Sequence, residues 1–174
     1  MARRRKLEAF TNDPRDPLEL MARMLVSSSY RVPVEGRSSR PSMTSADISA
    51  AVGLMADPLE AGTALAVATR ANRPEIARLA FLAYRRVLRN VRKMQPRPVD
   101  LREAADRWRV RMVTYDAVHD LVWPEQRRPY AQAAKDTKMR AAAYVALYRA
   151  AHATMAEVLA TGRRAFSTAL WGGG

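Results

Sequence analysis

The stretch PYAQAAKDTKMRAAAYVALYRAAH, residues 129–152, decides how the C-terminal part of the chain folds. It holds two alanine-rich runs, each typical of a helix, and a charged segment at residues 135–138 separates them. Pro129 suits the start of the first run, because proline is tolerated where a helix begins. The pattern therefore favours two helices joined by a turn over one continuous helix.

A helix-turn-helix needs small residues where its helices touch and apolar residues on the inner face of its second helix. Ala133 and Ala134 supply the small positions, and Tyr144 and Leu147 supply the inner face. Tyr148 would extend that face. The same pattern also fits a helical hairpin buried in a bundle, with alanines that permit close approach, so both interpretations stay open.

The turn departs from the usual motif, because Lys138 stands where glycine is common. A left-handed lysine costs roughly 1 kcal/mol, which a fold can tolerate. On the outer face of the second helix only Arg140 and Arg149 offer donors to guanine, so we expect modest sequence specificity. The predicted DNA contacts are Arg127, Arg128, Lys135, Lys138, Arg140 and Arg149.

The chain is strongly basic, with a net charge of +13 and a pI of about 11.1. Residues 71–111 carry twelve basic side chains against four acidic ones. This balance favours nucleic acid as a partner over an anionic membrane or an acidic protein. Tyr84 and Trp108 lie among these arginines and would either stack on bases or join the core. A basic surface facing RNA or polymerase is predicted at Arg85, Arg86, Arg89, Arg92, Lys93 and Arg97.

Hydrophobic periodicity along the chain is helical, and no segment has the alternation of a strand. We predict an all-α fold, a compact multi-helix domain with a C-terminal helix-turn-helix that runs into a long terminal helix. Residues 1–16 would be a flexible basic arm, and 17–174 a single domain, with a helical body at 44–122 and the helix-turn-helix unit at 123–171. Helices are expected at 16–29, 44–58, 57–72, 73–94 and 99–123, with a loop at 30–43 and Asn72 as a left-handed helix stop.

Residue types that carry catalysis are scarce. The chain has no cysteine, which excludes disulfides and cysteine-based zinc sites, and no glycine-rich phosphate loop. His119 and His152 have no ligand partner at metal spacing, and Asp116 with Asp120 makes only a pair of carboxylates. We expect a non-enzyme without cofactor or metal. With no apolar run of ~20 residues and no secretory signal, we expect no membrane partner and a place in the bacterial host cytoplasm.

Two stretches resemble a known family. GRSSRPSMTSADISAAVGLM (36–55) places Ser-Arg-Pro before a helix with an acidic start. YAQAAKDTKMRAAAYVALYRAAHATMAEVL (130–159) is similar to a helix-turn-helix that runs into a terminal helix. Together they resemble the late-gene antitermination (Q) proteins of lambdoid phages, over about the last 135 residues.

The resemblance implies a phage factor that binds double-stranded DNA near a late promoter and engages bacterial RNA polymerase to suppress pausing and termination. The helix-turn-helix would contact DNA, and we infer that the basic surface at 73–111 faces nascent RNA or the polymerase. Two alternatives remain. One is a small terminase subunit that recognises viral DNA for packaging, and the other is a helical inhibitor that binds only protein.

Overall fold

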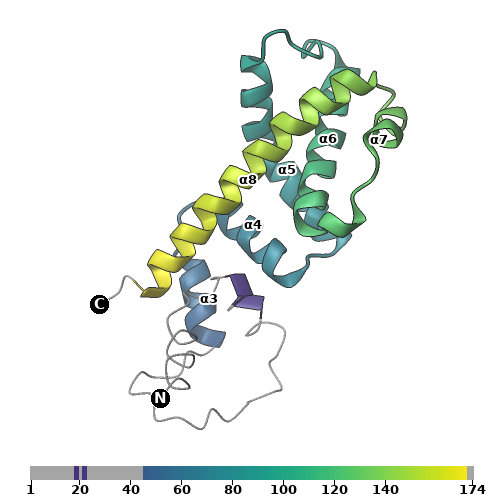
Figure 1. Ribbon diagram of the computed structural model, residues 1–174. Coiled ribbons are helices and arrows are strands. Elements are labelled where there is room, and N and C mark those ends of the chain that lie inside the picture. The colour runs from purple at the N-terminus through teal and green to yellow at the C-terminus, as the bar shows by residue number, and fades with distance from the viewer. Residues whose placement is uncertain (1–17, 20, 23–44, 172–174) are drawn as a thin grey trace, which may run out of the picture.

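The computed structural model describes residues 18, 19, 21, 22 and 45–171 (Figure 1). No strand occurs in these ranges, and the predicted all-α domain is confirmed. The predicted arm at 1–16, the loop at 30–43 and most of the helix at 16–29 lie outside the described residues. The helices are α3 (Ser45–Gly53), α4 (Pro58–Thr69), α5 (Arg73–Lys93), α6 (Ala104–Val122), α7 (Tyr130–Asp136) and α8 (Ala141–Trp171), with the 3-10 helix η1 at Pro124–Gln126.

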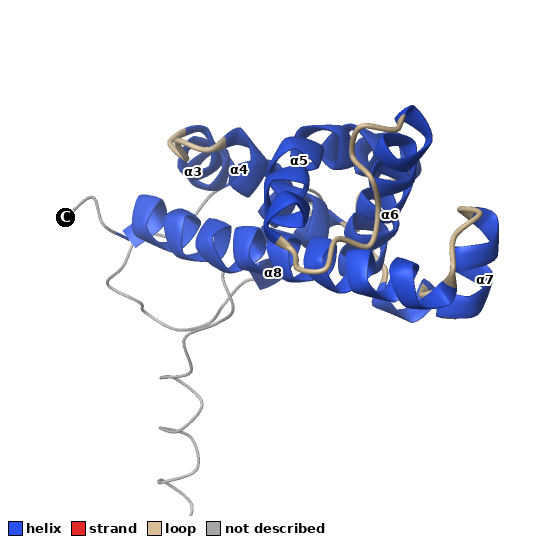
Figure 2. Cartoon of the chain, turned by 90° about the horizontal axis from the view of Figure 1, so that it is seen from above, coloured by secondary structure: helices blue, strands red, loops and turns tan. Residues whose placement is uncertain are grey.

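The long helix α8 is the axis of the domain. Its 31 residues span roughly 46 Å, and it contacts every other α-helix from α3 to α7. Figures 1 and 2 show α7 beside its N-terminal end and α3 near its C-terminal end. Three apolar clusters line its inner face in order, the first around Leu147, the second around Met155 and the third around Phe166.

The junction between α4 and α5 corrects one expectation. Asp57 caps α4, since its carboxylate accepts a 2.8 Å hydrogen bond from the Leu59 amide. The left-handed residue after α4 is Arg70, with φ 55°, and not Asn72. Asn72 instead begins α5 through a reciprocal capping box with Glu75. Its short side chain accepts from the free amide of Glu75 there.

Helix α6 is shorter than the predicted 99–123 segment. It begins at Ala104, because Asp100 and its neighbours form a turn instead. The Asp100 carboxylate accepts from the Arg102 amide at 2.9 Å, and the Asp100 amide donates to Asp106 at 2.7 Å. Aspartate favours such local bonds, which compete with helix at this position.

The crossing of α4 and α8 depends on a glycine. A Cβ atom built on Gly162 would lie 2.7 Å from the backbone carbonyl oxygen of Glu60. That distance is shorter than two non-bonded heavy atoms tolerate, so the two helix backbones touch here only because the residue has no side chain. The C-terminal half of α8 is thus held by direct backbone approach and apolar packing around Phe166.

Candidate nucleic-acid interface

The turn between α7 and α8 settles whether the alanine-rich stretch is one helix or two. Helix α7 ends at Asp136, and Lys138 takes the left-handed conformation with φ 52°. The Lys138 amide donates to the Lys135 carbonyl at 3.0 Å, and the Met139 amide donates to the Ala134 carbonyl at 2.9 Å. These two bonds are the Schellman arrangement that closes a helix C-terminus. The prediction of two helices, with Lys138 in the usual glycine position, is confirmed.

The inner face of this unit is also as predicted. Ala133 and Ala134 are 2% exposed, and Tyr144 and Leu147 of α8 are buried with them in one cluster. Tyr148 extends the same face. The small alanines let α7 lie close to α8, so the seven-residue α7 is held mainly by tertiary packing and not by its own helical stability.

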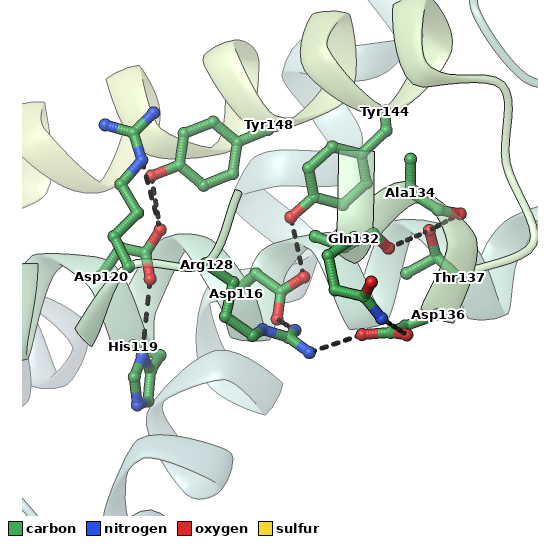
Figure 3. Close-up of polar contacts among 12 residues, drawn as sticks. Asp116, His119, Asp120, Arg128, Gln132, Ala134, Asp136, Thr137, Tyr144 and Tyr148 are labelled. Carbon is green, nitrogen blue, oxygen red and sulfur yellow. Dashed lines mark hydrogen bonds and ion pairs between the residues drawn. The ribbon is translucent and has the colours of Figure 1, made fainter. Parts of the chain in front are cut away.

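A buried carboxylate of α6 ties the unit to the rest of the domain (Figure 3). The Tyr144 hydroxyl donates to one oxygen of Asp116 at 2.8 Å, and Arg128 donates to the other at 2.8 Å. Arg128 also donates to Asp136 at 2.8 Å, and Gln132 donates to the second oxygen of Asp136 at 2.9 Å. One chain of bonds therefore links α6, the segment before α7, the end of α7 and α8.

Burial governs the protonation of this group. It raises the pKa of Asp116, although the Tyr144 hydroxyl and the Arg128 guanidinium both favour its charged form. Burial, together with the negative charge of Asp116, raises the pKa of Tyr144 well above its ordinary value. At neutral pH the phenol therefore stays a proton donor to the carboxylate.

A second carboxylate, one turn further along α6, repeats the arrangement. The Tyr148 hydroxyl donates to Asp120 at 2.9 Å, and Arg127 lies 3.8 Å from the same oxygen. The Arg127 guanidinium also stands 4.6 Å from the ring centre of Tyr130 and 5.1 Å from that of Tyr148. His119 lies 3.4 Å from the other oxygen of Asp120, so both α6 carboxylates are engaged within the protein.

These contacts divide the six predicted DNA contacts into two groups. Arg127 and Arg128, although about half exposed, already bind carboxylates of the domain. The structure thus gives both arginines a role in holding the α7–α8 unit, and their predicted contact with phosphate stays a prediction. The remaining four are exposed and form no ion pair with any described residue: Lys135, Lys138, Arg140 and Arg149.

Small side chains cover the outer face of α8 beside these cations. Ala141 and Ala142 are exposed, and Ala143 and Ala146 are half-buried. Arg149 stands out from this alanine surface two turns along the helix. Such a face can approach a nucleic-acid backbone closely, yet it presents few groups that read base edges.

The basic surface predicted along α5 is in part engaged within the protein. Arg86 lies 3.2 Å from Asp57 and 3.9 Å from Glu60, so it fastens α5 to the start of α4. Arg89 and Lys93 line a hollow of about 210 Å³ beside α8, which also contains Glu60 and Glu157. Arg85, Arg92 and Arg97 are exposed, and the predicted contact of this basic surface with RNA or polymerase stays a prediction.

Sequence reasoning missed the partners of Asp116 and Asp120. The two aspartates are four residues apart on α6, and their partners Tyr144 and Tyr148 are four residues apart on α8. Two matched pairs in the same order mean that the helices run parallel here and that each pair lies one turn from the next. The repeated four-residue spacing was a visible signal, but the sequence does not show that these helices are neighbours.

No group of three or more His, Asp or Glu side chains in the described part of the chain is arranged to hold a metal ion. Among the described helices, none is long and apolar enough to cross a membrane.

Comparison with protein-family models, curated proteins and solved structures gave no match. The resemblance to phage late-gene antitermination proteins therefore stays a prediction, and a proposal for the function depends on the site itself.

Proposed function

We propose that the protein binds double-stranded DNA through α7, the Lys138 turn and the first turns of α8, and that it acts there as a transcription antitermination factor. The observation that carries the DNA-binding part is the turn itself. A lysine occupies a left-handed position at a cost of roughly 1 kcal/mol, and its side chain is exposed and has no acidic partner among the described residues.

Electrostatics support a phosphate-binding role for this surface. Arg127 and Arg128 pair with the carboxylates Asp116, Asp120 and Asp136 behind the turn, so these acids are partly offset within the protein. The cations Lys135, Lys138, Arg140 and Arg149 are exposed and form no ion pair with a described residue. Phosphate oxygens are the partners that such cations bind in nucleic-acid complexes, where contacts of this kind supply most of the affinity.

The geometry also supports a model in which this unit binds DNA and a second partner supplies the sequence specificity. With alanines across the outer face of α8, this unit has only Arg149 and Arg140, the residue before the helix, to reach base edges, so we expect it to discriminate weakly between DNA sequences. A second partner would then supply specificity. On the basis of the family resemblance, we propose bacterial RNA polymerase as this second partner, with nascent RNA as a further one.

The experiment is transcription through a terminator with purified bacterial RNA polymerase, on a template that carries the candidate late promoter. We expect readthrough to rise with the wild-type protein and to fall back in the Arg140→Ala and Arg149→Ala variants. Arg164→Ala is the matched control, because Arg164 is exposed on the same helix but lies roughly 22 Å beyond Arg149.

Unchanged readthrough with the wild-type protein would contradict antitermination. Equal loss in Arg164→Ala would contradict the assignment to the turn. A ring of about eight or more subunits in a size measurement would favour a DNA-packaging role over antitermination.

A further inference from the structure

A second surface lies between α5 and α6, away from the α7–α8 turn. It is a groove of about 340 Å³ whose lining is mostly apolar. Phe81 is 75% exposed and Trp108 is 46% exposed, although both are large apolar side chains that folding normally buries. Tyr84 and Tyr115 line the same groove, so four aromatic residues surround one opening to solvent.

The sequence explains why Phe81 is left outside. The buried stripe of α5 includes Ala80 and Ala83, and Phe81 is turned about 100° from Ala80 around the helix. An apolar residue placed off the stripe gains nothing for the core. Trp108 likewise lies off the buried side of α6, two residues before the buried Val110. Phe81 and Trp108 belong to none of the described core clusters, whereas Tyr84 packs against one of them.

The charge that lines the groove is positive. Among the described residues, Arg111 is the only charged side chain in the lining, and its guanidinium stands 5.0 Å from the ring centre of Tyr84. Arg85 follows Phe81 by one helical turn, and Arg107 precedes Arg111 by one turn, and both are exposed. The nearby carboxylate of Asp106 is neutralised by Arg109.

Exposed aromatic rings among arginines suit unpaired nucleotides. Bases stack on the rings regardless of their identity, and arginines follow the phosphates between them. An apolar peptide would leave the arginines without partners, and a duplex hides its base faces in the stack. We propose that the α5–α6 groove binds single-stranded RNA by stacking bases on Phe81 and Trp108. The choice of RNA over single-stranded DNA rests on the proposed role in transcription, where the emerging strand is RNA.

The test measures binding of the full-length protein to a fluorescein-labelled oligouridylate of about 12 nucleotides by fluorescence anisotropy. We expect Trp108→Ala and Phe81→Ala each to weaken RNA binding roughly 5- to 150-fold, the range for one stacked base. Trp108→Tyr should restore most of the affinity, because a ring remains. Leu82→Ala is the control, since Leu82 is 47% exposed on the same helix but lies outside the groove lining.

Two further probes separate this inference from the proposed function. Oligothymidylate of equal length tests the choice of RNA, and equal or tighter binding to it would overturn that choice. Duplex DNA tests the α7–α8 surface, and Trp108→Ala should leave duplex binding unchanged. If the wild-type protein does not bind oligouridylate, or if Leu82→Ala weakens binding as much as Trp108→Ala, the groove assignment is wrong even where duplex binding stands.

Discussion

The two halves of α8 are held in different ways. Its N-terminal half is fixed by directional bonds, since Tyr144 and Tyr148 each donate to a carboxylate of α6. Its C-terminal half is fixed by shape, with Gly162 against the α4 backbone and Phe166 fully buried. The difference shows where orientation matters. Directional bonds set the angle of the unit that carries the unpaired cations, whereas close packing at the other half supplies stability.

The largest effect should come from filling the contact at Gly162. Gly162→Ala places a methyl group against the Glu60 carbonyl, and α4 must shift because backbone cannot rotate aside. We expect a loss of about 2–3 kcal/mol in the free energy of unfolding, measured by urea denaturation.

Gly62→Ala is the matched control for that change. Gly62 also lies inside a helix, but its added methyl would meet only the Leu79 side chain, at 3.4 Å. It should be neutral or stabilise the protein by up to about 1 kcal/mol. Equal destabilisation by both variants would show that close backbone approach does not hold the C-terminal half.

Removal of one directional bond should cost less. Tyr144→Phe leaves the ring in place but deprives the buried Asp116 of a hydrogen bond at 2.8 Å. We expect the free energy of unfolding to fall by about 1–2 kcal/mol. Tyr115→Phe serves as control, because the Tyr115 hydroxyl forms no hydrogen bond with any described residue. If the two variants are equally stable, the network does not hold the N-terminal half.

The same bond predicts how stability responds to alkaline pH. The pKa values of Tyr144 and Tyr148 are raised above 10.0 in the folded state, first by burial and then by the aspartate partners. The unfolded chain therefore loses these protons at lower pH than the folded protein does. The stabilisation is present below pH 10 and is lost as pH rises above it.

Over the pH range in which urea unfolding can be measured, this loss of stability should be smaller than the loss caused by Tyr144→Phe. The measurement is urea unfolding at a series of pH values, with tyrosinate absorbance followed in parallel. Tyr144→Phe should show a shallower loss of stability above pH 10 than the wild-type protein. Parallel curves for the two proteins would contradict the assigned role of the phenol.

The smallest change in stability is expected at the turn, where the substitution should stabilise the protein. Lys138→Gly relieves the left-handed strain at φ 52° and should raise the free energy of unfolding by about 0.5–1 kcal/mol. It also removes one unpaired cation, so duplex DNA should bind more weakly despite the greater stability. Unchanged DNA affinity in this variant would show that Lys138 does not contact phosphate.

The turn and its flanks could be predicted from the sequence because their signals are local. Alanine spacing and the inward positions Tyr144 and Leu147 act within one or two helical turns. The engagement of Arg128 by Asp116 could not be predicted, because it depends on how α6 lies against α7. Asn72 was assigned to the wrong helix end because asparagine suits both a left-handed stop and an N-cap, and local sequence does not choose between them.

Only part of the groove between α5 and α6 could be predicted from the sequence. Tyr84 and Trp108 stood out among arginines, but stacking and core positions were both open. The structure shows that Trp108 is exposed, and it adds Phe81, which sequence reasoning had passed over. Hydrophobic periodicity places Phe81 off the buried stripe of α5, but it does not show that Phe81 and Trp108 line one groove.

We propose that unpaired cations around the α7–α8 turn bind duplex DNA, and the salt dependence of binding is the sharpest test of this proposal. The slope of log K against log salt reports how many phosphates the protein neutralises, at about 0.9 for each. The double variant Arg140→Ala/Arg149→Ala should reduce this slope by about 1.8, while Arg164→Ala should leave it unchanged. A wild-type affinity that does not fall as salt rises, or an equal slope in the double variant, would contradict the claim.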